Sequence, residues 1–335
     1  MTDSAKPRST RRSPRDWLNR RSLRDWLNRR SPRDWLNRRS LRDWLEAPVP
    51  ATPWQARMQQ SMSQWRRFCR NTSALFGLVV IIIIAAAALF APWLATHGIF
   101  TQNLQLRLAA PGAEYWLGTD ELGRDIYSRL IFGARITLYI TCLSALIVGP
   151  IGLLVGTIAG TVGGWVDTVL MRIVDIFLAF PSLILALGFV AALGPGIENA
   201  IIAISLSAWP PIARLARAEA LSIRKMDYVA AVRLQGASQM RIILRHIIPM
   251  CLPSVVVRLT LNMAGIILTA ASLGFLGLGA QAPSPEWGAM LSSGRQFMMT
   301  NWTIAAIPGL SILLTSLAFN LFGDGLRDVL DLRHD

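Results

Sequence analysis

Six long apolar runs constrain what this 335-residue chain can fold into. The first, at 74–95, includes LFGLVVIIIIAAAALFAPWLA and contains no charged residue. A helix of this length, rising about 1.5 Å per residue, crosses a hydrocarbon core of about 30 Å. Five more apolar runs follow at 136–158, 168–192, 200–217, 254–276 and 303–323. The sequence therefore predicts an all-α integral membrane protein with six transmembrane helices.

The net charge of +14 is concentrated near the start of the chain. Residues 1–73 contain 18 Lys and Arg against 6 Asp and Glu, whereas 74–335 contain 16 against 14. Within the latter, the loop 213–258 has a net charge of +6. Six spans place both termini on one side, and cytoplasmic loops carry the excess of Lys and Arg. We therefore expect the termini and this loop in the cytoplasm. A charged content of only 16% argues against a soluble nucleic-acid-binding protein.

A nine-residue repeat, such as RRSPRDWLN, recurs four times between residues 11 and 46. Each copy reads Ser-x-x-Asp, which is typical of a helix N-cap followed by an acidic residue at the third helical position. A helix this short is marginal in water, so the pattern favours a low-complexity, disordered extension. The sequence leaves open three alternatives for these repeats. They could contact anionic lipid, bind nucleic acid, or result from a start site placed too far upstream.

These patterns divide the chain into six parts. They are the repeats at 1–46, a cytoplasmic linker and basic helix at 47–73, the first transmembrane helix at 74–95, an extracytoplasmic segment at 96–135, a five-helix core at 136–323 with a cytoplasmic loop at 213–253, and a cytoplasmic C-terminus at 324–335.

The chain contains no sequence motif of an enzyme or a metal site. GxSxG, HExxH and GxxxxGK[ST] are absent, and the three cysteines have no ligand spacing, so we expect free thiols and no catalytic, cofactor or metal residues. Asp175 follows Arg172 by three positions, which predicts an interfacial ion pair within one helix. A secondary transporter would need intramembrane ionisable residues and an inverted repeat, and no such repeat is present.

Glycines and prolines mark contacts and bends in the spans. The second span carries a glycine at every fourth position, which lets another backbone approach one helix face. Pro181 and Pro308 are positioned to kink the third and sixth spans. The predicted helix-packing residues are Gly152, Gly156, Gly160 and Gly164.

The loop segment 228–249, YVAAVRLQGASQMRIILRHIIP, predicts a helix–glycine–helix hairpin. The first helix ends near Leu234, Gly236 accepts the positive φ of a sharp turn, and a second helix leads into the fifth span. Such a knob suits a groove on a soluble partner, and a helix lying on the bilayer surface is the alternative.

This segment resembles the EAA loop of bacterial ABC importer permeases, which docks into the ATPase subunits. Three further stretches are similar to the C-type permeases of the dipeptide, oligopeptide and nickel branch: LGTDELGRDIYSRLIFGAR at 117–135, LGFLGLGAQAPSPEWGAML at 273–291 and AFNLFGDGLRDVLD at 318–331. The resemblance covers about residues 48–335. The chain departs from the family where the EAA triad falls on Ala230, Ala231 and Val232, and in its repeats.

The resemblance implies a type I, MetI-like permease in a bacterial inner membrane, which hydrolyses nothing itself. Its partners would be a homologous B-type permease, two ATPase subunits that bind ATP and Mg, and an extracytoplasmic binding protein. Cargo would be dipeptides or short peptides, with nickel chelates, glutathione or D-amino-acid dipeptides as alternatives. The implied ATPase contact comprises Tyr228, Ala231, Arg233, Gly236, Ala237, Ser238 and Arg241. The implied binding-protein-facing residues are Gly118, Thr119, Asp120, Gly123, Arg124, Asp125, Pro285, Glu286 and Trp287.

Overall fold

The computed structural model describes residues 52–330 and divides the chain into two units, Met1–Ser63 and Gln64–Asp335. The repeats at 11–46 lie outside the described residues. One helix, α3 (Pro53–Arg70), begins in the first unit and ends in the second. Its sequence contains no acidic residue, and Arg67 and Arg70 lie in its last turn. All contacts discussed below lie within residues 64–330.

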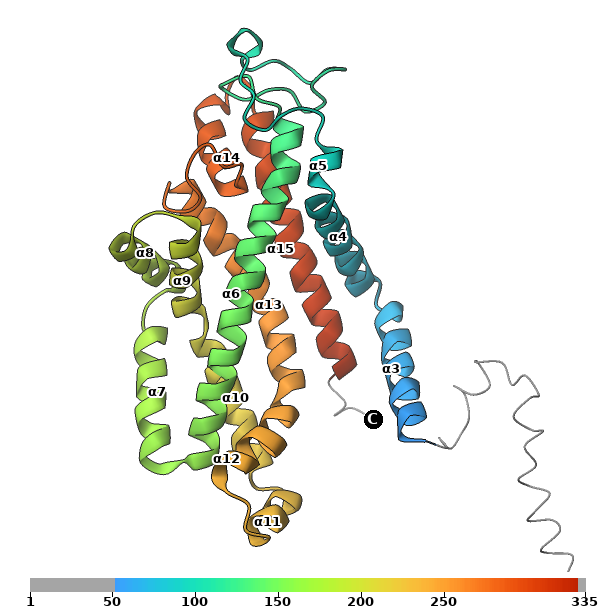
Figure 1. The fold of residues 1–335 in the computed structure, drawn as a ribbon, viewed down its shortest axis with the longest axis vertical. Helices are drawn as coiled ribbons and strands as arrows, with labels where there is room; N and C mark the ends of the chain where they lie inside the picture. The colour runs from blue at the N-terminus through green and yellow to red at the C-terminus, as the bar shows by residue number, and fades with distance from the viewer. Residues whose placement is uncertain (1–51, 331–335) are drawn as a thin grey trace, which may run out of the picture. The chain divides into compact units, whose positions relative to one another are not determined.

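The second unit is helical, and an isolated bridge between Thr119 and Asp125 is the one β-contact among the described residues. Figure 1 shows its long helices running side by side. The helices are α4 (Thr72–Leu89), α5 (Ala91–Leu94), α6 (Ile126–Val162), α7 (Gly164–Leu178), α8 (Ser182–Leu193), α9 (Ile197–Ala208), α10 (Pro210–Ile223), α11 (Asp227–Leu234), α12 (Gln239–Ile242), α13 (Ile248–Phe275), α14 (Trp287–Gly294) and α15 (Thr303–Leu330), with a π-helical turn at Ile243–Ile247 and single 3-10 turns at Leu104–Leu106 and Arg295–Phe297.

Four helices are long and apolar enough to cross a membrane: Thr72–Leu89, Ile126–Val162, Gln239–Phe275 and Thr303–Leu330. The predicted span at 168–192 is instead two helices, α7 and α8, bent by 91°. The bend occurs at Pro181, as predicted, because proline lacks an N–H and disfavours a helical residue before it. Counting this pair as one span, the described residues give up to five.

The predicted span at 200–217 is also broken. Here α9 ends at Ala208 and α10 begins at Pro210, so neither helix reaches membrane-spanning length. Two consecutive prolines, Pro210 and Pro211, remove two N–H donors at this point. The described residues therefore give four spans, or five with the bent pair, and the expected count of six transmembrane helices stays a prediction.

Helices α6 and α10 approach closely along a row of glycines. A Cβ added to Gly152 would lie 2.7 Å from the Ile212 side chain, and one added to Gly160 would lie 2.7 Å from the Arg217 carbonyl oxygen. Gly156 faces the Ala213 carbonyl in the same way. Gly164 does not share this contact, because it begins α7 with φ of +57° and has nothing near its missing Cβ.

Two ion pairs hold α7 against α10. The Arg217 Nη2 lies 2.6 Å from Asp167 Oδ2, and the Arg214 Nη2 lies 2.6 Å from Asp175 Oδ1. The predicted partner of Asp175 was Arg172 on its own helix. That prediction is wrong, because α7 packs against α10 and brings Arg214 into reach instead.

Candidate functional site

The hairpin, residues 227–242, lies at one end of the second unit, where Figure 1 shows α11 and α12. Its first helix ends at Leu234, and Gly236 then adopts φ of +81°, a conformation that side chains with a Cβ rarely accept. Ser238 caps α12 by accepting a hydrogen bond from the Arg241 N–H at 3.4 Å. This is the helix–glycine–helix arrangement that the sequence predicted.

The hairpin is anchored by apolar side chains that point into the unit. Val229 and Ile247 are fully buried and Ile242 is nearly so, packed with Ile223 and Cys251 between α10 and α13. The ring of Tyr228 lies 6.4 Å from the His246 ring, and burial raises the pKa of the Tyr228 hydroxyl. The knob is therefore fixed to the ends of two long helices and moves with them.

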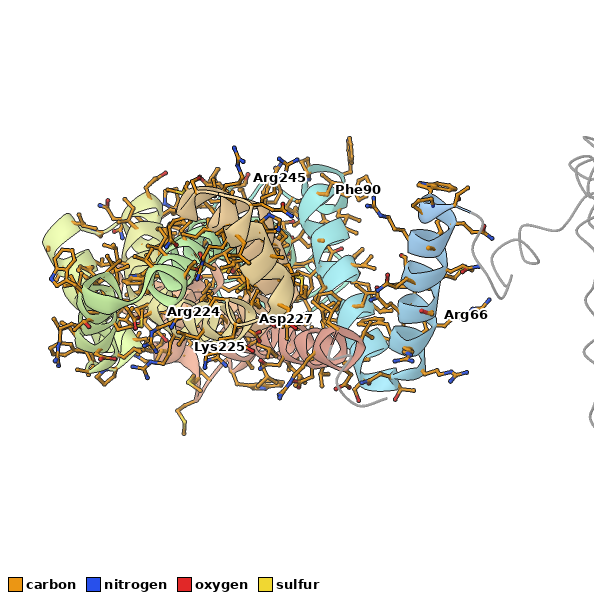
Figure 2. The ribbon with its side chains drawn as sticks, turned by 90° about the horizontal axis from the view of Figure 1, so that it is seen from below. Arg66, Phe90, Arg224, Lys225, Asp227 and Arg245 are labelled. Atoms are coloured by element: carbon orange, nitrogen blue, oxygen red, sulfur yellow. The ribbon has the colours of Figure 1, made fainter. Side chains whose placement is uncertain are left out.

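The outer surface of the hairpin is exposed. All of the predicted contact residues except Ala237 are exposed, and Ala237 packs against the buried cluster. The structure adds two apolar side chains that sequence reasoning missed, Leu234 at 89% and Met240 at 59% exposure. The sequence does contain a signal for Leu234, because it is an apolar residue at the C-terminal end of a short helix, close to the turn glycine. Figure 2 shows Arg224, Lys225, Asp227 and Arg245 around this end.

The segment 96–125 lies at the other end of the unit. Gly118 and Gly123 both have positive φ, and Asp120 accepts hydrogen bonds from the N–H groups of Leu122 and Arg124, both at 2.9 Å. Asp125 then caps α6 by accepting from the Ser128 N–H at 3.0 Å. These contacts fold the sequence LGTDELGRD into a closed loop that leads directly into the helix.

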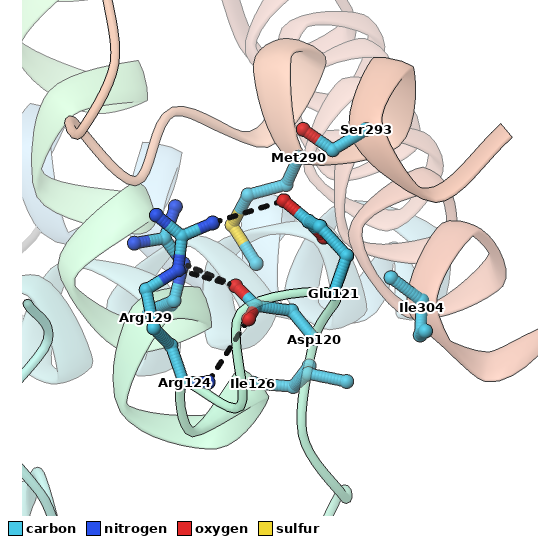
Figure 3. A pocket seen from close by; sticks show the side chains of 8 residues that line it. All are labelled: Asp120, Glu121, Arg124, Ile126, Arg129, Met290, Ser293 and Ile304. Carbon is cyan, nitrogen blue, oxygen red and sulfur yellow. Dashed lines mark hydrogen bonds and ion pairs between the residues drawn. The ribbon is translucent and has the colours of Figure 1, made fainter. Parts of the chain in front are cut away.

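Three residues of this loop and one residue of the first turn of α6 form an ion cluster, consisting of Asp120, Glu121, Arg124 and Arg129. The Arg124 Nε lies 2.6 Å from Asp120 Oδ2, and its Nη2 lies 3.1 Å from Glu121 Oε1. Figure 3 shows the Asp120 carboxylate facing both guanidinium groups, beside a cavity of about 10 Å³. Removing one partner of a buried pair costs about 3–5 kcal/mol, because it leaves an uncompensated charge.

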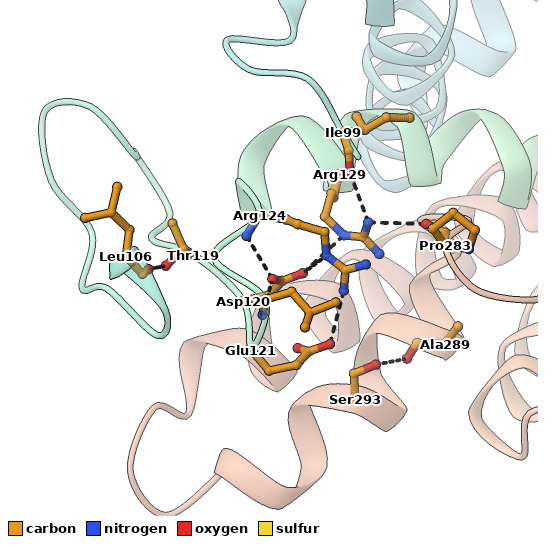
Figure 4. A network of polar contacts seen from close by, with 11 residues as sticks. Ile99, Leu106, Thr119, Asp120, Glu121, Arg124, Arg129, Pro283, Ala289 and Ser293 are labelled. Atoms are coloured by element: carbon orange, nitrogen blue, oxygen red, sulfur yellow. Dashed lines mark hydrogen bonds and ion pairs between the residues drawn. The ribbon is translucent and has the colours of Figure 1, made fainter. Parts of the chain in front are cut away.

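Arg129 was not predicted as a site residue, yet it joins three segments. Its Nε lies 3.5 Å from Asp120 Oδ2, and its Nη1 donates to the carbonyls of Ile99 at 3.2 Å and Pro283 at 3.3 Å. Figure 4 shows this bridge between the 96–125 loop and the turn before α14. The two ends of the bridge are far apart in sequence, so no local pattern marks this arginine.

Glu286 and Trp287 complete this end of the unit. The Glu286 carboxylate caps α14 by accepting from the N–H groups of Gly288 and Ala289, both at 2.8 Å. Burial raises the pKa of Glu286 to about 7 despite these two bonds. The Trp287 Nε1 donates to the Leu130 carbonyl at 2.9 Å, which fixes α14 to α6.

Every residue predicted to face a binding protein is buried. This set consists of Gly118, Thr119, Asp120, Gly123, Arg124, Asp125, Pro285, Glu286 and Trp287. That prediction is corrected: their side chains hold the loops together and do not form the outer surface. Exposed apolar side chains at this end include Phe100, Leu104, Trp116, Met299 and Trp302.

Among the described residues, no group of three or more His, Cys, Asp or Glu is placed to hold a metal ion. Cys69, Cys142 and Cys251 are free.

Long apolar helices, broken spans and an exposed hairpin at one end define a polytopic membrane permease. The family of binding-protein-dependent transport system inner membrane components matches residues 152–334, and the N-terminal TM domain of oligopeptide transport permease C matches residues 60–111. The chain belongs to this family of integral membrane permeases of ABC importers, which place several apolar helices in the inner membrane.

Three relatives are similar along most of their length. The dipeptide transport system permease protein DppC of Alkalihalophilus pseudofirmus is 44% identical over 85% of this chain and 95% of its own. The di/tripeptide transport system permease protein DppC of Pseudomonas aeruginosa is 45% identical over 80% and 90%. A probable D,D-dipeptide transport system permease protein, DdpC, of Escherichia coli is 46% identical over 76% and 85%.

A solved structure shares the fold. An inward-facing conformation of the MetNI methionine ABC transporter aligns with a TM-score of 0.50 at 24% identity, covering 61% of this chain and 97% of that one. The helical core is therefore the MetI-like, type I importer permease fold.

Proposed function

We propose that this chain is the permease subunit of an ATP-driven ABC importer that carries dipeptides across the bacterial inner membrane. The main support for this proposal is the exposed hairpin anchored on α10 and α13. An ATPase subunit that binds the hairpin contacts a segment that is fixed to both helices. Three relatives named for dipeptide or di/tripeptide transport support the cargo. The D,D-dipeptide relative keeps D-amino-acid dipeptides as the alternative cargo, ahead of glutathione and nickel chelates.

The complex comprises this chain, a homologous B-type permease, two ATPase subunits and an extracytoplasmic binding protein. ATP and Mg bind in the ATPase subunits, and this chain is not an enzyme and binds no cofactor. The hairpin and both termini face the cytoplasm, and the 96–125 loop faces outward. The basic residues beside the hairpin support this orientation, because cytoplasmic loops are enriched in Lys and Arg.

The hairpin contacts the ATPase through its exposed turn. Leu234 and Met240 enter an apolar groove, while Arg233 and Arg241 lie at the rim of the contact. Because Val229 and Ile242 are buried, movement of the docked ATPase is transmitted to α10 and α13. This is a coupling of two distant sites through one rigid element.

The outer contact with the binding protein uses side chains around the ion cluster. Phe100, Leu104 and Trp116 are exposed on the loop that the cluster holds folded, and Met299 and Trp302 are exposed after α14. Aromatic side chains and Met are enriched in interfaces of this kind. The buried ion cluster acts indirectly, by keeping this surface in shape.

Substitution of Gly236 tests the coupling. Gly236→Val should abolish binding-protein-dependent dipeptide uptake in vesicles, because a β-branched residue is strained at φ of +81°. Gly236→Asn is the matched control and should retain most uptake, because asparagine tolerates this conformation and nothing lies within 4 Å of the added Cβ. Co-purification of ATPase subunits should fall with the valine variant. Full uptake by a correctly inserted valine variant would refute the coupling role.

A further inference from the structure

Helix α13 carries a polar stripe along one face, made of Arg258, Asn262, Gly265, Thr269 and Ser272. Their spacing of four, three, four and three residues places all five on the same side of a helix. Arg258 and Gly265 are exposed and the other three are half-buried. Figure 1 shows α13 as one of the long central helices, so this stripe runs through the membrane-spanning part of the unit.

Arg258 has no hydrogen-bond or ion-pair partner within residues 52–330. An exposed arginine on a membrane-spanning helix is costly against lipid and faces protein or water instead. The opposite face of α13 is different, because its exposed residues are apolar, including Leu252 and Val256. The polar face is therefore the side of α13 that is suited to an aqueous path.

The broken span lies beside the same stripe. Asn262 Nδ2 donates to the Ala208 carbonyl at 3.4 Å, at the point where α9 ends before the two prolines. Trp209 keeps helical dihedrals, φ −73° and ψ −29°, so the interruption consists of the two N–H donors that Pro210 and Pro211 lack. Prolines in membrane helices are tolerated where neighbouring helices and polar side chains satisfy the freed backbone groups, and Asn262 is such a side chain. The polar stripe of α13 therefore faces the proline interruption between α9 and α10.

The stripe offers different chemistry at its two ends. The Thr269 hydroxyl donates to the Gly265 carbonyl at 2.9 Å, and the Ser272 hydroxyl donates to the Leu268 carbonyl at 2.7 Å. Both hydroxyl oxygens thus remain acceptors on the open side. Toward the hairpin end, Arg258 presents a cation, and one turn further Ser254 Oγ donates to Glu219 at 3.1 Å.

We propose that the polar stripe of α13 lines the translocation path and that the Arg258 guanidinium binds the carboxylate of the passing dipeptide. This inference rests on the proposed function. Arg258 and Asn262 are four residues apart, a rise of about 6 Å along the helix. An extended dipeptide spans about 7 Å, so its amino end reaches Asn262 when its carboxylate is bound at Arg258. A guanidinium–carboxylate pair can be bidentate, which favours a peptide terminus over an uncharged solute.

Cysteine accessibility tests which face of α13 is wet. The native Cys69, Cys142 and Cys251 are replaced by alanine, and the assembled importer in vesicles is treated with a charged, thiolate-specific reagent. Gly265→Cys and Thr269→Cys should react, and dipeptide delivered by the binding protein should slow the reaction. The matched controls, Leu252→Cys and Val256→Cys, are exposed on the opposite face and should not react. Equal reactivity of the two faces, high or low, would overturn the lining role.

Charge substitution tests the carboxylate site. Arg258→Gln should reduce dipeptide uptake about tenfold or more, because a hydrogen bond to a charged group contributes about 1.5–3 kcal/mol. Arg258→Lys should restore part of the uptake. Assembly of the importer, measured by co-purification of the ATPase subunits, should be unchanged in both, since Arg258 lies outside the hairpin and the ion cluster. If the Arg258→Gln variant takes up dipeptides as fast as the wild type, this inference is overturned and the proposed function is not affected. If the wild-type complex does not transport dipeptides, the proposed function itself is refuted.

Discussion

At the scale of single residues, the end of the unit opposite the hairpin depends on buried polar groups whose partners are distant in sequence. Arg129 donates to carbonyls 30 and 154 positions away, and Glu286 lies in a pocket left open by Gly274. The sequence singled out Arg124, Asp125 and Glu286 through a family resemblance and assigned them to an outer surface. Their burial could not be predicted, because it depends on how the 96–125 loop folds over α14.

Glu286 should make stability depend on pH. Its folded pKa of about 7 lies above the ordinary value of 4.5, so the folded state favours the protonated form. This contribution is complete below about pH 4.5 and is lost as the pH rises through 7, and it amounts to on the order of 3 kcal/mol. Thermal unfolding of the purified complex should show a falling melting temperature from pH 5 to 7.5. Glu286→Gln should remove that part of the slope while lowering the melting temperature at pH 5, because one backbone N–H loses its acceptor.

The slope comparison controls for the other titrating groups of the complex, since they are the same in both proteins. A Glu286→Gln variant with the same pH slope as the wild type would contradict the role of this carboxyl.

At the scale of elements, the apolar runs located the membrane helices but not their breaks. The first, second, fifth and sixth runs each fall on a membrane-spanning helix of the structure. The third is bent at Pro181, which the sequence marked, whereas the break at Trp209 was missed although Pro210 and Pro211 stand there. A hydropathy profile averages side-chain hydrophobicity over a window of residues. It therefore does not detect the two backbone N–H donors that Pro210 and Pro211 lack. The hairpin was predictable, because a single glycine between two short helical patterns fixes its turn.

The α6–α10 contact gives a prediction about one element pair. Gly156→Ala should destabilise the complex by about 1–3 kcal/mol, because the added methyl meets the backbone of α10 at Ala213. Gly188→Ala in α8 is the matched control and should be neutral or slightly stabilising, because nothing lies within 4 Å of its added methyl. Thermal unfolding in detergent measures both. Equal effects of the two substitutions would show that α6 and α10 do not pack through this glycine row.

At the scale of the whole molecule, charge and structure agree on how the two ends of the second unit differ. The hairpin end carries exposed basic side chains, including Lys225, Arg233 and Arg241. The opposite end places Arg124 and Arg129 in a buried cluster with carboxylates, so the charges of this cluster are compensated. The sequence predicted this asymmetry because loop charge is local in the chain. It could not predict the compensation, which needs the folded loop.

The asymmetry predicts an orientation that labelling can test. In a background without native cysteines, Leu122→Cys should react with a membrane-impermeant maleimide added to intact cells, because the proposed orientation places the 96–125 loop outside. Gln239→Cys, an exposed position in α12, should react only after the inner membrane is opened. The physical reason is the cost of moving the basic residues beside the hairpin across the bilayer, which the positive-inside rule expresses. Both variants should label when the membrane is opened, which controls for buried thiols. Reaction at 239 but not at 122 in intact cells would invert the orientation and would also remove the hairpin from the reach of a cytoplasmic ATPase.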